Sequence, residues 1–356
     1  MSTISFAGDG LASELVPAEE LADCAATVLA QDAGRVLSYG TGAGYTPLRE
    51  LIAEWLFVHP YRVFVTNGWL QGFNLLAAGR LGGAPVLLED PMFNPVLRVC
   101  FREGANVIYA DRREGDLNLD DIEYQLRTNP QLALAYLTPS FHNPTGHTLT
   151  LEQRGRLARL FQRRPGVLVE DDSYGVLRFE GEQLPTIFQL ADQETIWSTS
   201  FSCSIAPGLR VGVFVLPGNL AAELTAQANA TYITPALLSQ ATVYEFARRG
   251  FFESNLERLR GLLRERRDAM LAALEQHLPD AGWTRPDGGI FLLLTLPPGT
   301  DAAAALERAE GVAALSGPAF GGMPNTVRLN FAGCALEEIE PGIERLAAAL
   351  SPALPA

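Results

Sequence analysis

Between residues 66 and 216 the sequence alternates helical segments with short, continuously apolar strands. Strands of this kind are buried on both faces, so they indicate a mainly parallel sheet covered by helices on each side. The predicted strands are 85–89, 106–110, 132–137, 167–170, 195–198 and 211–216. The predicted helices of this region are 68–81, 94–103, 119–127, 151–162 and 219–229. The predicted fold class is therefore α/β.

The remaining segments predict a division into three parts. Residues 1–36 are expected to form an N-terminal arm and part of the small domain, with a helix at 17–31, and residues 37–245 a large domain that also contains a helix at 47–57. Residues 246–356 form a linking helix and a small α+β domain, with strands at 290–295 and 326–331. The segment 237–277 is amphipathic throughout, so we expect one long helix there.

The long helical segment carries arginines interleaved with glutamates: Arg258, Arg260, Arg264, Arg266 and Arg267. Such a run is most often the solvated face of a helix. We therefore predict that these five side chains face water.

Polar residues follow several predicted strands, as in Glu170-Asp171-Asp172 and 198–202. Ligands of open α/β sheets bind outside the carboxyl ends of the strands, so these residues are candidates for a binding site. The stretch 197–212 adds two hydroxyls, Ser200 and Ser202, and the guanidinium of Arg210. Hydroxyls and an arginine fork in one loop suit a dianionic phosphate.

Two stretches resemble a known family: Ser202-Cys-Ser-Ile-Ala-Pro-Gly-Leu-Arg210 and Asn143-Pro-Thr-Gly146. They resemble the fold-type I pyridoxal phosphate (PLP) enzymes, and most closely the class I/II aminotransferases of the aminoadipate and MocR-like branch. The segment of that branch reads Ser-Lys-Thr-Leu-Ala-Pro-Gly-Leu-Arg. The resemblance extends over nearly the whole chain. It implies a large coenzyme-binding domain with a mainly parallel sheet and a smaller α+β domain.

The resemblance implies roles for residues around the coenzyme ring. Asp171 would lie beside the pyridine nitrogen, where its charge raises the pKa of that nitrogen and keeps it protonated. Tyr174 and Asn143 would hydrogen-bond the phenolic oxygen. Phe93 would stack on the ring.

The resemblance also implies a phosphate site and a shared dimer. The residues at the phosphate would be Ser200, Ser202, Arg210 and the backbone at the helix start formed by Gly68, Trp69 and Leu70. The family has small or polar residues at the last two positions, so we expect these bulky side chains to narrow the phosphate site. Tyr39 would reach the phosphate in the neighbouring subunit, which implies a homodimer with a shared active site.

The substrate side of the site is implied in the same way. Arg328 matches the arginine that grips the α-carboxylate of an amino acid or 2-oxo acid, and Asn143 lies beside that ligand. His142 stands where the family usually has glutamine. It is either a proton carrier with a near-neutral pKa or a loop histidine that fills a glutamine-sized space.

The position of the family's lysine is occupied by Cys203. All 27 Lys and Arg residues of the chain are arginines, so no side-chain amine can form an imine with the coenzyme aldehyde. We expect PLP or pyridoxamine phosphate (PMP) to be held noncovalently, with Cys203 and Tyr174 at the catalytic positions and ordinary transamination impaired. Two alternatives stay open: an enzyme that uses external amine chemistry with another base, and a catalytically inactive sensor or structural dimer that binds a coenzyme form or another anionic metabolite.

Charge and composition limit the partners. The net charge of −14 disfavours nucleic acid and anionic membranes, because phosphate backbones must be neutralised by basic residues. No apolar stretch is long enough to cross a bilayer and no signal peptide is evident, so a cytoplasmic location is expected. The four cysteines lack metal-type spacing, and no metal site is predicted.

Overall fold

The computed structural model describes residues 3–112, 116–162, 166–191 and 195–351. Its largest sheet has seven strands in the order β2-β8-β7-β6-β5-β3-β4. These strands are β2 (Val63–Asn67), β3 (Pro85–Asp90), β4 (Asn106–Asp111), β5 (Leu134–Leu137), β6 (Val167–Asp171), β7 (Ile196–Ser200) and β8 (Val211–Val215). Only β8 runs antiparallel to its neighbours, which confirms the predicted α/β fold with a mainly parallel sheet.

Side chains of the central strands alternate between two apolar layers, as successive strand residues must. Leu88 and Tyr136 belong to a cluster with helices on one face, whereas Leu87 and Leu137 belong to a cluster on the other. The first face is covered by α3 (Trp69–Ala77), α4 (Asn94–Arg102) and α8 (Gly218–Thr231). The second is covered by α5 (Leu119–Thr128), α6 (Leu151–Phe161) and α7 (Ile187–Leu190). Both faces are therefore buried.

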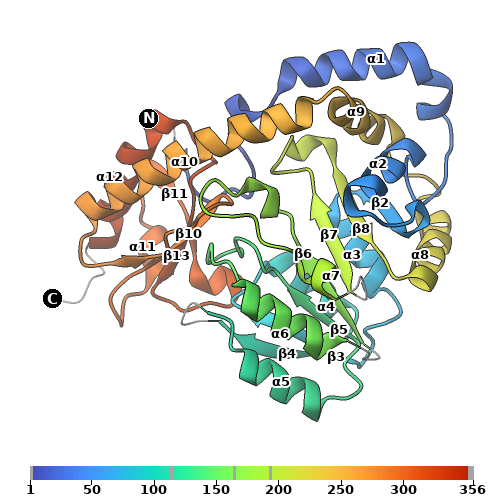
Figure 1. Cartoon of the computed structure of the whole chain (residues 1–356). Helices are drawn as coiled ribbons and strands as arrows, with labels where there is room; N and C mark the ends of the chain where they lie inside the picture. The colour runs from blue at the N-terminus through green and yellow to red at the C-terminus, as the bar shows by residue number, and fades with distance from the viewer. Residues whose placement is uncertain (1–2, 113–115, 163–165, 192–194, 352–356) are drawn as a thin grey trace.

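The C-terminal part has its own four-stranded sheet in the order β12-β13-β10-β9. Its elements are β9 (Gly282–Trp283), β10 (Phe291–Thr295), β12 (Leu315–Ser316), β13 (Thr326–Asn330), α11 (Ala302–Leu306) and α12 (Ile339–Leu350). The N-terminal strand β1 (Ile4–Ser5) pairs in parallel with β11 (Val312–Ala313), so the N-terminal segment belongs structurally to this part. Figure 1 shows this region beside the large sheet.

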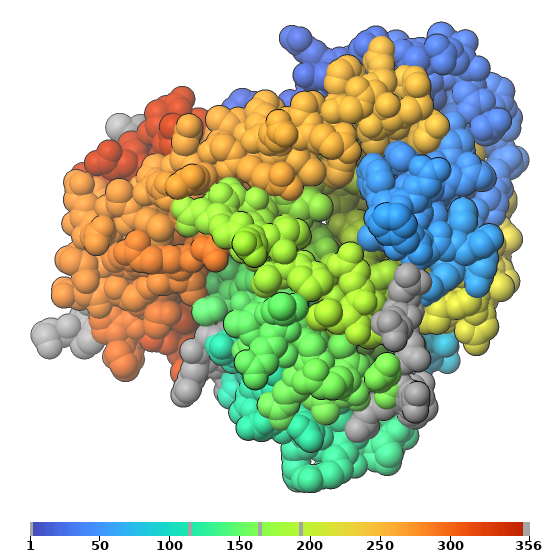
Figure 2. All heavy atoms as spheres, viewed as in Figure 1, coloured from blue at the N-terminus to red at the C-terminus, as the bar shows by residue number. Residues whose placement is uncertain are grey.

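Three further helices flank the molecule: α1 (Ala18–Val36), α2 (Thr46–Leu56) and α9 (Leu237–Arg248). Helix α10 (Phe251–His277) then runs along one edge to the C-terminal part, and the space-filling view shows its orange residues as a continuous ridge (Figure 2). The single helical segment predicted over 237–277 is therefore wrong. Gly250 has φ 76° and separates α9 from α10, since a left-handed residue ends an α-helix.

The predicted solvent exposure of the α10 arginines is correct for Arg258 and Arg264, but Arg260 is half-buried, and the prediction is wrong for the buried Arg266 and Arg267. Arg266 is 4% exposed and donates to the carbonyl oxygen of Cys334, and Arg267 is 5% exposed and donates to that of Pro286. Each also pairs with a glutamate from a distant segment. Arginine tolerates such burial because its fork of donors is satisfied by carbonyl and carboxylate oxygens.

No helix in the described part of the chain is both long and apolar enough to cross a bilayer.

Candidate functional site

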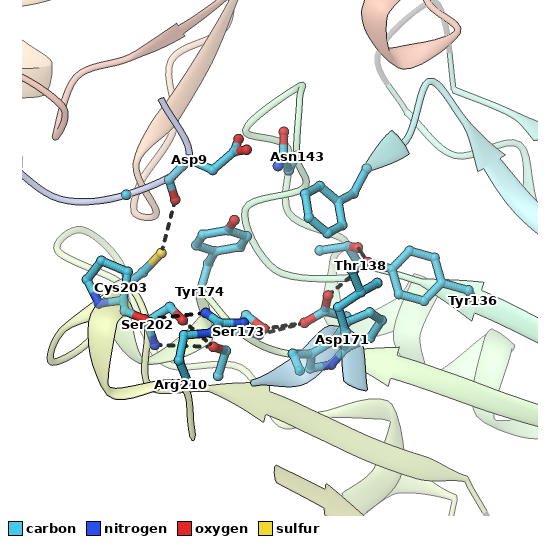
Figure 3. A pocket seen from close by; sticks show the side chains of 16 residues that line it. Asp9, Tyr136, Thr138, Asn143, Asp171, Ser173, Tyr174, Ser202, Cys203 and Arg210 are labelled. Carbon is cyan, nitrogen blue, oxygen red and sulfur yellow. Dashed lines mark hydrogen bonds between the residues drawn. The ribbon is translucent and has the colours of Figure 1, made fainter. Parts of the chain in front are cut away.

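A cavity of about 440 Å³ opens at the carboxyl ends of β5, β6 and β7. Figure 3 shows side chains from these strand ends converging with Asp9 of the N-terminal segment. Ten of the residues singled out from the sequence line it: Trp69, Leu70, Phe93, Asn143, Asp171, Tyr174, Ser200, Ser202, Cys203 and Arg210. The site expected at the strand ends is therefore assembled in space, as the topology of open α/β sheets favours.

Asp171 ends β6 and lies on one wall of the cavity. Its Oδ2 accepts a hydrogen bond of 2.8 Å from the hydroxyl of Tyr136, and its Oδ1 accepts from the backbone N–H and the hydroxyl of Ser173. Burial raises the pKa of this carboxyl, whereas the hydrogen bonds from Ser173 and Tyr136 oppose that rise. Three donors thus orient the carboxyl group, which can also accept a hydrogen bond from a ligand.

Asn143 presents a free donor to the same cavity. Its Oδ1 accepts from Nη1 of Arg328 at 3.1 Å, which fixes the orientation of the amide. Its Nδ2 is buried and has no hydrogen-bond partner among the described residues. Because buried polar groups are rarely left unpaired, this nitrogen is suited to an acceptor atom of a ligand.

Tyr174 lines the cavity beside Asn143, with its ring edge-on to Phe291 at a centroid distance of 5.7 Å. Burial raises the pKa of its phenol well above the ordinary value. The hydroxyl therefore stays protonated at neutral pH and can donate a hydrogen bond.

Two hydroxyls and an arginine gather at another wall. The hydroxyl of Ser200 donates to that of Ser202 at 3.0 Å and accepts from the backbone N–H of Ser202 at 3.2 Å. Arg210 has φ 53° and crosses Gly68, where a Cβ would lie 2.1 Å from its Nη2. Only glycine therefore lets Arg210 approach the start of α3. Arginine, hydroxyls and the free N–H groups of a helix start together can hold a phosphate.

The indole of Trp69 is directed largely into the core, although the residue also borders the cavity. Its Nε1 donates to the hydroxyl of Ser198 at 2.9 Å, and its ring stacks on Phe73 with centroids 5.2 Å apart. Most of the Trp69 side chain therefore packs in the core and narrows the expected phosphate site less than its size suggests.

Cys203 is 5% exposed, and its sulfur contacts the main-chain oxygen of Asp9 at 3.7 Å. Burial, reinforced by the nearby carboxylates of Asp9 and Asp171, raises the pKa of the thiol to about 12. A thiol with this pKa is neutral at pH 7, so it acts as a weak donor and not as a base or nucleophile.

Arg328 lies on β13 and is fully buried, but it does not line the cavity. Its guanidinium donates to Asp9, to Asn143 and to two main-chain oxygens of the N-terminal segment. Asp9 and Asn143 separate it from the cavity. The arginine expected to meet a ligand carboxylate thus already pairs with a carboxylate of its own chain.

Two further candidates lie away from the cavity. His142 is 1% exposed, and burial together with Arg112 lowers the pKa of its imidazole well below the ordinary value. This contradicts a proton carrier with a near-neutral pKa and supports the space-filling alternative. Tyr39 is 83% exposed and does not reach the cavity of its own chain.

Sequence reasoning gave no role to three residues that line the cavity: Asp9, Tyr136 and Ser173. Tyr136 carried a usable signal, because a tyrosine within a buried strand needs a partner for its hydroxyl. Ser173 follows β6, at a strand end where polar residues were expected. Asp9 carried only its place in a glycine loop, Gly8-Asp9-Gly10.

The chain is similar to several known proteins. The model of the family "Aminotransferase class I and II" matches residues 9–346. The 2-aminoadipate transaminase of Thermus thermophilus is 39% identical, over 98% of this chain and 90% of that protein.

Two solved structures are also similar. The α-aminoadipate aminotransferase LysN of T. thermophilus, complexed with N-(5'-phosphopyridoxyl)-L-leucine, is 36% identical with a TM-score of 0.92, covering 98% of this chain and 92% of that one. The kynurenine aminotransferase of Pyrococcus horikoshii, in complex with PMP, is 30% identical with a TM-score of 0.93, covering 100% and 92%. The chain belongs to the class I and II aminotransferase family.

Proposed function

We propose that this protein binds PLP or PMP noncovalently in the large cavity, with Cys203 at the position of the family's lysine. The observation that carries the proposal is the neutral, buried thiol of Cys203 on the cavity wall of a chain without lysine. No side-chain amine can form an imine with the coenzyme. The residues expected to bind the coenzyme noncovalently nevertheless line the cavity.

The cavity residues fit the coenzyme in three places. The unpaired Nδ2 of Asn143, together with the hydroxyl of Tyr174, suits the phenolic oxygen. The carboxyl of Asp171 suits the pyridine nitrogen, and Phe93 supplies an aromatic wall. Ser200, Ser202, Arg210 and the helix start at Gly68, Trp69 and Leu70 would hold the phosphate. When bound, the coenzyme would supply an aldehyde or amine and an electron-withdrawing ring.

Cys203 and Tyr174, which the resemblance places at the catalytic positions, do not supply a base for moving a proton at the substrate carbon. Cys203 stays protonated because its pKa is about 12, and Tyr174 stays protonated for the same reason of burial. The imidazole of His142 does not line the cavity. General acid–base participation contributes about 10²–10⁴-fold, so ordinary transamination of an amino acid and a 2-oxo acid should be impaired by at least this factor.

We further propose a cytoplasmic homodimer in which Tyr39 of one subunit completes the phosphate site of the other. The exposure of Tyr39 supports this arrangement. The net charge of −14 supports the absence of nucleic-acid binding. The boundaries 1–36, 37–245 and 246–356 stay our proposed division of the chain.

The proposal is tested by titrating PLP and PMP into the purified protein and following absorbance and tryptophan fluorescence. One coenzyme per chain, removable by dialysis and without the visible band of a covalent imine, is the expected result. The variant Cys203→Lys should gain that band and a borohydride-stable adduct, whereas the control Cys203→Ser should not. Saturable binding of neither coenzyme would contradict the proposal and favour a sensor or structural role with another ligand.

A further inference from the structure

We propose that Asp9 is a specificity-determining residue, which makes the cavity prefer ligands whose group facing Arg328 is uncharged over ligands with a carboxylate there. The inference deepens the proposed function, on which it rests for the identity of the site. It follows from the hydrogen bonds that already occupy both terminal nitrogens of Arg328, whose buried Nε is the one guanidinium nitrogen without a partner among the described residues.

Both terminal nitrogens of Arg328 are saturated. Nη1 donates to Oδ1 of Asp9 at 2.5 Å and to Oδ1 of Asn143 at 3.1 Å. Nη2 donates to the carbonyl oxygens of Ala7 at 2.7 Å and Gly8 at 3.1 Å. Two terminal nitrogens carry four N–H donors, and four acceptors use them. A bidentate carboxylate therefore finds no free pair of donors.

The faces of the guanidinium are covered as well. Its carbon lies 4.2 Å from the ring centroid of Phe291 and 4.7 Å from that of Phe320. Arg328 is fully buried, whereas the side chain of Asp9 is 58% exposed. A group that enters from the cavity thus meets Asp9 and Asn143 before it can reach the arginine.

Asp9 borders the cavity, and its carboxylate is directed towards Asn143 above the ring of Tyr174 (Figure 3). A ligand carboxylate at this place would meet a like charge at close range, which is unfavourable. An uncharged amide would instead offer an N–H donor to Asp9. The cavity therefore presents an acceptor, and not a free cation, to the ligand.

A carboxylate can still bind if the Asp9 side chain rotates away. The main chain around it is held independently, because Nδ2 of Asn330 donates to the carbonyl oxygens of Gly8 and Gly10. The carboxylate of Asp9 and that of the ligand therefore compete for Arg328, and the N-terminal segment around Asp9 can stay in place. Removing the charge of Asp9 should relieve it.

The test compares 4-methylpentanoate with 4-methylpentanamide, which share a carbon skeleton and differ in charge. Calorimetric titrations use the full chain with and without PMP, since the pair of Asp9 and Arg328 belongs to the protein itself. The wild type should bind the amide more tightly. Asp9→Asn should tighten binding of the carboxylate about threefold to fivefold, the upper part of the range for an exposed charge pair, and leave the amide within twofold.

Glu19→Gln is the matched control, because it removes one exposed negative charge from the same N-terminal region. It should change neither ligand. Asp9→Gly serves as a second variant if Asp9→Asn misfolds by circular dichroism. An unchanged preference in both Asp9 variants, or no carboxylate binding by either, would overturn the inference. Failure of PMP to bind would contradict the proposed function alone, because the two ligands are still compared on the protein without coenzyme.

Discussion

The sulfur of Cys203 lies 3.7 Å from the main-chain oxygen of Asp9, so the loop that carries Cys203 and the N-terminal segment meet at one wall of the cavity. The contact encloses the thiol and contributes to its burial. At this wall Cys203 presents a thiol that neither attacks a carbonyl nor accepts a proton at neutral pH.

The thiol of Cys203 should resist alkylation. With a folded-state pKa of about 12, roughly one molecule in ten thousand carries the thiolate at pH 8. Iodoacetamide labelling, followed by peptide mass spectrometry, should rise about tenfold per pH unit and reach no plateau up to pH 10. A plateau below pH 9 would contradict the assignment, and urea-unfolded protein provides the reactive control.

The same raised pKa has a consequence for stability. As pH rises above the ordinary thiol value of 9.0, the unfolded chain releases this proton before the folded chain does. The free energy of unfolding contributed by Cys203 should therefore fall above pH 9 and be unaffected below it. Urea melts of the wild type and Cys203→Ser at pH 7.5 and 10 measure the difference.

Arg210 should account for much of the phosphate affinity. Arg210→Gln removes a charged donor from the wall that also carries Ser200 and Ser202, at a cost of about 2 kcal/mol or roughly thirtyfold in the Kd for PLP. Arg285→Gln, at an exposed arginine, is the control. An equal effect of the two substitutions would place the phosphate elsewhere.

The two kinds of arginine on α10 should differ in their contribution to stability. Arg267 is buried and makes two hydrogen bonds to Glu180, whereas Arg264 is 57% exposed. Arg267→Ala should lower the free energy of unfolding by about 2 kcal/mol or more, because carbonyl and carboxylate acceptors lose their donor. Arg264→Ala should cost less than about 0.5 kcal/mol in urea denaturation. Equal costs would mean that burial of Arg267 contributes nothing.

The chemistry of the strand ends was readable from the sequence. Asp171 follows an apolar strand and Ser200 ends the next one, and the parallel order of β6 and β7 brings both to one edge. Local sequence patterns were enough to predict this, because the carboxyl ends of neighbouring parallel strands always lie at the same edge of the sheet. The antiparallel direction of β8 and the existence of β2 were not predicted, since an apolar run does not encode its direction.

Contacts between distant segments were beyond such reasoning. Asp9 and Arg328 are separated by 319 positions, and no pattern near either residue indicates the other. The burial of Arg266 likewise depends on Glu14, which a helical repeat within α10 cannot reveal. Tertiary packing decides these cases, and the specificity of the site depends on one of them.

The central claim is tested most directly by mass spectrometry of the PLP-saturated native protein after borohydride treatment. We predict an intact chain of unchanged mass, together with about one equivalent of coenzyme released on unfolding. A pyridoxyl group joined to the polypeptide would contradict the account.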